Sequence, residues 1–155
     1  MDTVTETDRI ERSIVIHAPR ERVWHALTNT GEFSAWFGAK LEGQTFAPGQ
    51  RIRGPVTGCG HENVLFDVVV ERMEAPNLFA YRWHPCPIDP TVDYDQEEPT
   101  RVTFTLKDAP GNGTLLTVVE SGFDRVPPHR RMEAFRMNNQ GWEIQLGNIA
   151  RYAST

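Results

Sequence analysis

Apolar and polar residues alternate along several short segments of the chain, and residues typical of turns separate these segments. The first segment, residues 10–17, alternates isoleucine with polar residues, which indicates a half-buried β-strand. Pro19 follows, and proline is favoured in the first turn of a helix. Val23 and Leu27 then lie one helical turn apart and predict a short helix. A second short helix is expected over residues 32–37.

Five further strands are predicted between turns rich in glycine, proline and asparagine, over residues 50–56, 63–73, 78–83, 101–107 and 115–120. In residues 63–73, Phe66, Val68 and Val70 share one side of the strand, and we expect that side to face the core. No helical pattern separates these strands, so the sheet should be antiparallel. The polar, acidic stretch at residues 85–99 predicts a surface loop.

The last segment carries the clearest helical pattern. Pro127 and Pro128 mark its start. After them, residues recur at alternating steps of three and four, as on one face of an α-helix: Met132, Phe135, Asn139, Trp142, Leu146, Ile149 and Ala153. A helix over residues 128–153 would be about 39 Å long, enough to cover one face of the sheet. Gly141 and Gly147 weaken such a helix, and we expect close backbone packing around them.

The order of elements therefore predicts one α+β domain over residues 9–155, after a flexible tail at residues 1–8. A curved antiparallel sheet of about six to seven strands should wrap around the long C-terminal helix, with two short helices after the first strand. The chain has 155 residues, which suits one domain and leaves little room for a second.

Charge and composition exclude several classes of function. The formal net charge of −5 disfavours binding to nucleic acid or to anionic membrane surfaces. No apolar run approaches the roughly 20 residues of a membrane span, and the first residues lack the apolar core of a signal peptide, so no membrane insertion is expected. Two cysteines are too few for a secreted disulfide framework. We therefore expect a cytoplasmic protein with reduced thiols.

Four short motifs add to the order of elements. They are APRERVWHALT at residues 18–28, WFG at 36–38, ESGF at 120–123 and GW at 141–142. Together they resemble the family of activators of the heat-shock chaperone ATPase, within the START-like or SRPBCC superfamily, over about residues 10–153. The resemblance implies a helix-grip fold with an internal cavity between sheet and C-terminal helix. Members of the superfamily include chaperone cofactors, lipid and hormone binders and cyclase-like enzymes, so the resemblance does not imply one activity.

Aromatic residues are concentrated in the segments that should meet between sheet and helix. One interpretation is an ordinary apolar core. The other is the lining of a pocket for an apolar or aromatic small molecule, with a few polar groups among apolar walls. The candidate lining residues are Trp36, Phe37, Phe66, Tyr81, Trp83, Phe104, Phe135 and Trp142.

Two polar residues interrupt these apolar patterns. Asn139 lies within the helical stripe, where it either bonds protein or water or presents its amide to a ligand. Glu120 follows Leu116 and Val118 at a spacing of two and should face inward with them. A buried carboxylate needs a raised pKa or a cationic partner. The candidate partners for a structural salt bridge are Arg101, Arg131 and Arg136. The alternative is that Glu120 anchors a ligand or acts as a general base.

Two triplets, Cys59-Gly60-His61 and His84-Pro85-Cys86, would approach each other if the strands on either side of residues 76–77 form a hairpin. Two thiolates and two imidazoles suit tetrahedral zinc. The one-residue spacing within each triplet is tighter than zinc-binding turns usually have, so solvated histidines and free thiols are the other interpretation. We therefore expect no metal and no cofactor.

Three classes of function follow from these features. The first is a binding module for an apolar small molecule. The second is a cyclase-like or hydrolase-like enzyme, with Glu120 or His61 as the acid–base group. The third is a protein-interaction module such as a chaperone cofactor, which would need an exposed apolar patch. The sequence offers no clear interface between two copies, and homodimerisation stays open.

Overall fold

The computed structural model describes residues 8–57, 65–85 and 91–154. Within these residues the predicted order of elements is confirmed: a strand, two short helices, further strands and a long C-terminal helix. The strands are β1 (Arg9–Ile16), β2 (Arg51–Pro55), β3 (Leu65–Glu74), β4 (Leu78–Trp83), β5 (Thr100–Ala109) and β6 (Gly113–Ser121). The α-helices are α1 (Arg20–Thr28), α2 (Thr30–Phe37) and α3 (Pro128–Ala153), and the short 3₁₀ turns are η1 (Tyr94–Gln96) and η2 (Phe123–Arg125).

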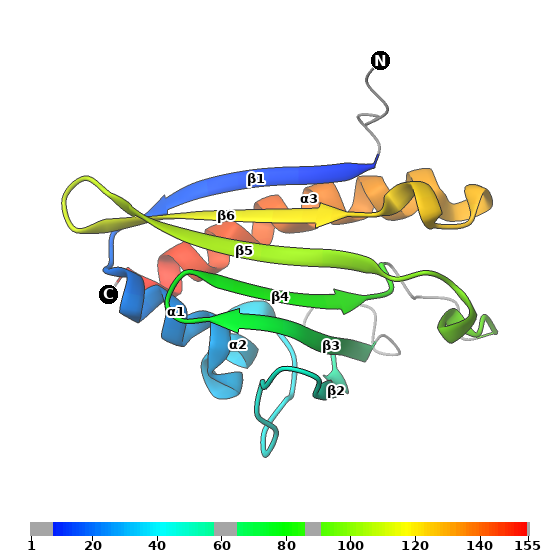
Figure 1. Ribbon diagram of the computed structural model, residues 1–155, viewed down its shortest axis with the longest axis horizontal. Coiled ribbons are helices and arrows are strands. Elements are labelled where there is room, and N and C mark those ends of the chain that lie inside the picture. The colour runs from blue at the N-terminus through cyan, green and yellow to red at the C-terminus, as the bar shows by residue number, and fades with distance from the viewer. Residues whose placement is uncertain (1–7, 58–64, 86–90, 155) are drawn as a thin grey trace.

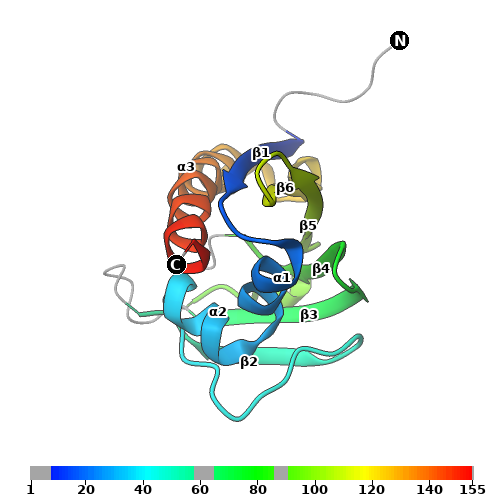
Figure 2. The ribbon, with the colours of Figure 1, turned by 90° about the vertical axis from the view of Figure 1, so that its left-hand side faces the viewer.

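The six strands form one antiparallel sheet in the order β1-β6-β5-β4-β3-β2. Figure 2 shows this sheet curling from β1 to β2, with α3 along the open side of the curl and α1 and α2 near one end. Figure 1 shows α3 running along most of the length of β1 and β6. The arrangement confirms the predicted helix-grip architecture, in which the long helix covers the inner face of a bent sheet.

Alternation along the strands decides which side chains enter the space between sheet and helix. Phe66, Val68 and Val70 of β3 are buried, as their spacing predicted. In β4 and β5, Tyr81 stands opposite Val102, and Val102 stands opposite Glu120 of β6. This row of three side chains therefore crosses the inner face of the sheet.

The buried face of α3 differs from the predicted stripe in its first half. Trp142, Leu146, Ile149 and Ala153 are buried as expected. Met132 is instead 50% exposed, while Ala134 is buried. Buried positions at steps of four drift around a helix that has 3.6 residues per turn, so the face that meets the sheet rotates along α3.

Gly54 of β2 lies where another segment of backbone crosses the edge of the sheet. A Cβ atom at this position would lie 1.9 Å from the carbonyl oxygen of Lys40 and 2.9 Å from a methyl group of Leu41. Gly141 of α3 has the opposite surroundings, since nothing lies within 4 Å of a Cβ built there. The expectation of close packing around Gly141 is therefore wrong. At Gly147 only the side chain of Arg151, from the same helix, comes within 4 Å.

The two glycines predict opposite effects of the same substitution. Gly54→Ala should lower the free energy of unfolding by about 1–3 kcal/mol, because the backbone of Lys40 must move. Gly141→Ala should raise it by up to about 1 kcal/mol, because alanine is the better helix former and meets no neighbour. Urea denaturation of the two variants and the wild type measures both changes, and a stable Gly54→Ala variant would contradict the close approach.

Candidate functional site

The carboxylate of Glu120 is the most deeply buried charged group among the described residues. Leu116, Val118 and Glu120 alternate along β6 and all three side chains are fully buried, so the predicted inward register is confirmed. The other buried polar residues described are Thr100 and Thr114. The Thr114 hydroxyl donates to the carbonyl of Ala18, away from Glu120. The polar part of the interior is therefore concentrated around one carboxylate.

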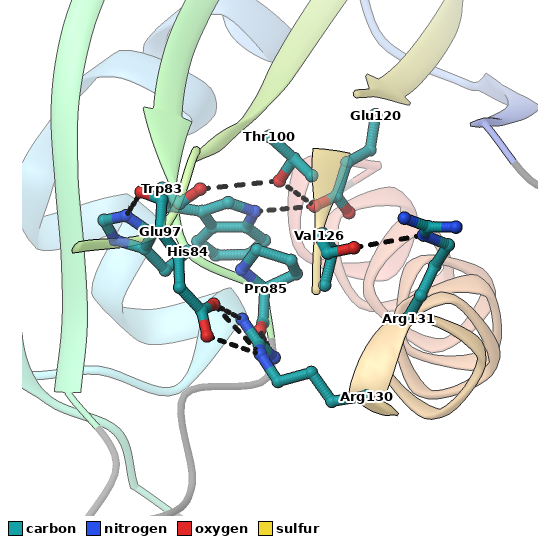
Figure 3. A network of polar contacts seen from close by, with 9 residues as sticks. All are labelled: Trp83, His84, Pro85, Glu97, Thr100, Glu120, Val126, Arg130 and Arg131. Carbon is teal, nitrogen blue, oxygen red and sulfur yellow. Dashed lines mark hydrogen bonds and ion pairs between the residues drawn. The ribbon is translucent and has the colours of Figure 1, made fainter. Parts of the chain in front are cut away.

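Four side chains donate hydrogen bonds to this carboxylate (Figure 3 shows two of them, Trp83 and Thr100). At Oε1, the indole nitrogen of Trp142 lies at 2.8 Å and the amide nitrogen of Asn138 at 3.0 Å. At Oε2, the indole nitrogen of Trp83 lies at 2.8 Å and the hydroxyl of Thr100 at 2.6 Å. The amide nitrogen of Asn138 also lies 3.1 Å from Oε2. Each oxygen therefore has at least two donors, which fill the acceptor positions of an ionised carboxylate. They come from the end of β4, the start of β5 and the middle of α3, so Glu120 joins three elements.

The predicted salt bridge from Glu120 to an arginine is wrong. Arg101 instead binds Glu71 on the outer face of the sheet. Arg131 donates to two backbone carbonyl groups, those of Val126 and Asp124, and Arg136 is exposed. Among the described residues no lysine, arginine or histidine is fully buried. Neutral N–H and O–H donors therefore take the place of the cation that the sequence suggested.

Burial raises the pKa of Glu120 above its ordinary value. The hydrogen bonds from Thr100, Trp83, Trp142 and Asn138 act in the opposite direction, because each favours the ionised form. A carboxyl group with these two opposing influences and no cationic neighbour can change its protonation state at a pH where an exposed glutamate stays ionised.

Tyr81 supplies the second unusual polar atom of the interior. Its side chain is fully buried, and its hydroxyl has no hydrogen-bond partner among the described residues. Burial raises the pKa of Tyr81 strongly, and the nearby charge of Glu120 raises it further, so the phenol stays protonated. A buried hydroxyl without a partner is destabilising and calls for an explanation.

Most of the predicted aromatic residues meet in one connected group. Trp83 stacks on Trp142 with ring centroids 5.7 Å apart, and Tyr81 lies 5.4 Å from Trp83 and 6.1 Å from Phe104. Phe66 lies 6.1 Å from both Tyr81 and Trp83. We call Phe66, Tyr81, Trp83, Phe104 and Trp142 the aromatic cluster. Most of it is buried, whereas Trp83 is only half-buried.

The two helices after β1 extend this group at one end. Phe37 of α2 is half-buried and lies 5.2 Å from Phe66 and 6.3 Å from Trp83. Trp36 is buried and donates from its indole nitrogen to the carbonyl of Ala26, so it joins α2 to α1. Phe37 and Trp83 are therefore the places where the aromatic interior reaches the surface beside α2.

Two predicted site residues lie elsewhere. Phe135 packs against Phe123 of η2, with ring centroids 5.3 Å apart, rather than in the aromatic cluster. The side-chain oxygen of Asn139 accepts a hydrogen bond from Arg12 of β1 at 3.0 Å, so its amide bonds protein. Asn138, one position earlier, is the asparagine that reaches Glu120. The three-and-four spacing of apolar residues did not predict Asn138, because that pattern takes the buried face of the helix to be straight.

Residues 84–85 and 94–97, which lie between β4 and β5, are held against the start of α3. The guanidinium of Arg130 binds the carboxylate of Glu97 and donates to the carbonyl of Pro85 at 2.7 Å (Figure 3). It also lies over the ring of Tyr94. A ring nitrogen of His84 lies 3.0 Å from the backbone oxygen of Glu97. This contact joins His84, which follows Trp83 in the chain, to the far part of the loop between β4 and β5.

The proposed zinc quartet falls largely outside the described residues, which exclude Cys59, His61 and Cys86. In the part of the chain that the structure describes, no group of three or more His, Cys, Asp or Glu side chains is placed to hold a metal ion. Nor does any described helix combine the length and hydrophobicity needed to cross a membrane.

Known proteins of the same fold match this chain over nearly its whole length. The model of the family described as "Activator of Hsp90 ATPase homolog 1-like protein" matches residues 17–154. Protein MLL2253 from Mesorhizobium loti is similar in structure, with a TM-score of 0.70 and 24% identity over 93% of this chain and 95% of that one. CalU16 from Micromonospora echinospora has a TM-score of 0.62 and 21% identity over 94% of this chain and 76% of that one.

DynU16, a protein of the dynemicin biosynthetic locus, is 25% identical, with a TM-score of 0.70. The match covers 96% of this chain and 48% of DynU16, so the chain spans about half the length of that protein. Comparison with curated proteins finds no match.

Removing the carboxylate should destabilise the protein, because it leaves the indole N–H groups of buried Trp142 and half-buried Trp83 without their acceptor. Each unsatisfied buried donor costs about 1–3 kcal/mol, so Glu120→Ala should lower the free energy of unfolding by at least about 2 kcal/mol. Glu133→Ala on the exposed side of α3 is the matched control and should change it by less than about 0.5 kcal/mol. Equal stability of the two variants in denaturant titrations would contradict the joining role of Glu120.

The raised pKa of Glu120 predicts a pH dependence with a definite sign. The folded state holds the proton of Glu120 more tightly than the unfolded chain does. The resulting stabilisation is complete below the unfolded pKa and is lost as pH rises through the folded pKa. Relative to Glu120→Gln, the wild type should therefore lose stability above the ordinary glutamate pKa, by up to about 1.4 kcal/mol per pH unit. Unfolding free energies of the two proteins measured from pH 4 to 9 test this, and parallel curves would refute it.

Proposed function

The chain belongs to the family of activator of Hsp90 ATPase homolog 1-like proteins, and from that premise we propose that it binds an apolar or aromatic small molecule between its sheet and α3. The proposal rests on one observation above all. Tyr81, inside the aromatic cluster, carries a buried hydroxyl that no described protein group satisfies. A ligand with a polar end would remove this cost, whereas an ordinary core would have replaced the tyrosine with phenylalanine.

The half-buried rings of Phe37 and Trp83 support a location for the opening. Their centroids are 6.3 Å apart, at the end of α2 and the end of β4. Large, rigid apolar rings at this position can contact a ligand that moves from solvent towards the buried rings of the aromatic cluster. The proposed ligand-binding residues are therefore Phe37, Trp83 and the rest of the aromatic cluster, with Trp36 behind them.

DynU16 supports the proposal from outside the chain. It is a protein of the dynemicin biosynthetic locus. A role in binding a small molecule agrees with the aromatic interior of this chain. The two cysteines and the acidic surface remain our reasons to expect action in the cytoplasm.

Titration with the neutral fluorescent probe N-phenyl-1-naphthylamine tests the proposal. The wild type should bind one probe per chain saturably, with enhanced probe emission. Phe37→Ala should weaken binding roughly threefold to tenfold, the range expected for loss of one aromatic contact. Ile144→Ala removes an apolar side chain that is 56% exposed on α3 and should leave the affinity unchanged. No saturable binding, or equal loss in both variants, would remove the proposal.

A second candidate is proton transfer by Glu120, and its buried carboxyl with a raised pKa favours it. All acceptor positions of the carboxylate are occupied, so a substrate would have to displace Asn138 or Thr100. Exchange of deuterium into the methyl group of 2-acetylnaphthalene, followed by NMR, tests this chemistry. We expect exchange with the wild type and none with Glu120→Gln if Glu120 acts as the base, and no exchange above background would exclude it for this ketone. His61 lies outside the described residues.

The name of the family raises a third candidate function, contact with a chaperone. Large apolar side chains that are exposed lie on three different elements: Val15 on β1, Leu65 on β3, and Met132, Met137 and Ile144 on α3. A docking site requires such residues to form one patch. Homodimerisation also stays open.

A further inference from the structure

We propose that the ligand of the aromatic interior is an electrically neutral aromatic molecule whose polar end is a hydrogen-bond-accepting oxygen, such as a ketone, bound by the hydroxyl of Tyr81. This proposal rests on the proposed binding function and deepens it by naming the chemical class of the ligand. It depends on the position of one hydroxyl and on the charges around it.

The sheet and the neighbouring rings hold the ring of Tyr81 in place. Its strand neighbours across the inner face are Val70 and Val102, which have small side chains. The rings of Phe66, Phe79, Trp83 and Phe104 lie 5.4 to 6.1 Å from the ring of Tyr81. A ring packed on several sides presents its hydroxyl in one direction, which suits recognition of a ligand atom.

The carboxylate of Glu120 does not satisfy this hydroxyl. Glu120 lies in the same cross-strand row as Tyr81, with Val102 between them. Its charge acts on Tyr81, but its two oxygens already accept from Trp83, Thr100, Asn138 and Trp142. The proton of Tyr81 therefore stays available for an acceptor that is not part of the described protein. A ketone or ether oxygen provides such an acceptor without bringing a donor of its own.

Charge in the interior excludes an anionic ligand. Bringing a carboxylate or phosphate into an apolar interior requires a buried cation, and no described lysine, arginine or histidine is buried. Arg130 is only 13% exposed, but Glu97 already neutralises it. An ionised Glu120 adds repulsion. Fatty acids and other carboxylates are therefore poor ligands, and neutral molecules are favoured.

Three probes with the same ring system separate these requirements: naphthalene, 2-acetylnaphthalene and 2-naphthoate. Each competes with N-phenyl-1-naphthylamine for the wild-type protein at pH 8, where the naphthoate is ionised. The ketone should bind roughly threefold to tenfold more tightly than naphthalene, because it adds one hydrogen bond. The naphthoate should bind at least about tenfold more weakly than the ketone.

Tyr81→Phe tests the assigned contact. It should abolish the advantage of the ketone over naphthalene. The variant should fold with an unfolding temperature no lower than that of the wild type, because the hydroxyl it removes has no described partner. Tyr152→Phe on α3 is the matched control, since the ring of Tyr152 lies under Arg22 and outside the aromatic cluster. It should keep the full advantage of the ketone.

The outcomes separate this proposal from the binding function. Equal affinities for the three compounds, or a ketone advantage that survives in Tyr81→Phe, would overturn the assigned ligand class while the binding function stands. The second result would mean that a group other than Tyr81 bonds the ketone oxygen. Tight binding of 2-naphthoate would refute the charge argument. Failure of the fluorescent probe and of all three compounds to bind would remove both proposals.

Discussion

The carboxylate of Glu120 accepts hydrogen bonds from the end of β4, the start of β5 and the middle of α3, and this interaction connects the helix to the sheet at the deepest point of the fold. An ionised carboxylate in an apolar interior is strongly unfavourable unless its acceptor capacity is filled. Here two indole N–H groups, one amide and one hydroxyl fill it without a cation. The positions of Trp83 and Trp142, and their stacking, therefore depend on the carboxylate between them.

The hydrogen bonds to Glu120 also affect the loop between β4 and β5. Trp83 and Thr100 begin and end the long loop between β4 and β5, so Glu120 holds both ends of that loop. Further along, Arg130 and Glu97 hold the same loop against the start of α3. The loop, the sheet and the helix thus meet around one polar centre. Among the described residues, that centre contains no cation.

Tyr81 differs from Glu120 in that its polar atom has no described partner. The two residues occupy one row of the sheet, yet the carboxylate bonds four other groups and the phenol bonds none of the described ones. A protein that needed only a stable core would favour phenylalanine here, because the hydroxyl loses its hydration without compensation. Family membership establishes the fold but not the ligand. The unsatisfied phenol is the feature that connects this particular sequence to a chemical class of ligand.

The sequence by itself determined the elements and most of their inner faces. Alternation along residues 63–73 and 115–120 predicted that Phe66 and Glu120 would face inward, because successive side chains of a strand point to opposite sides. The prolines and apolar steps predicted α3 from Pro128 to Ala153. The sequence also predicted that the aromatic residues would meet between helix and sheet, and most of them do.

Only the tertiary structure decided which groups meet across elements. Asn138, and not Asn139, donates to Glu120, because the buried face of α3 rotates as the helix crosses the sheet. The tertiary structure also placed neutral donors rather than Arg101, Arg131 or Arg136 at Glu120, and it left Phe135 against η2. The spacing of apolar residues along a helix or strand predicts on which side of that element a residue lies. The partner it meets depends on the angle and distance between two elements, which no pattern within a single element contains.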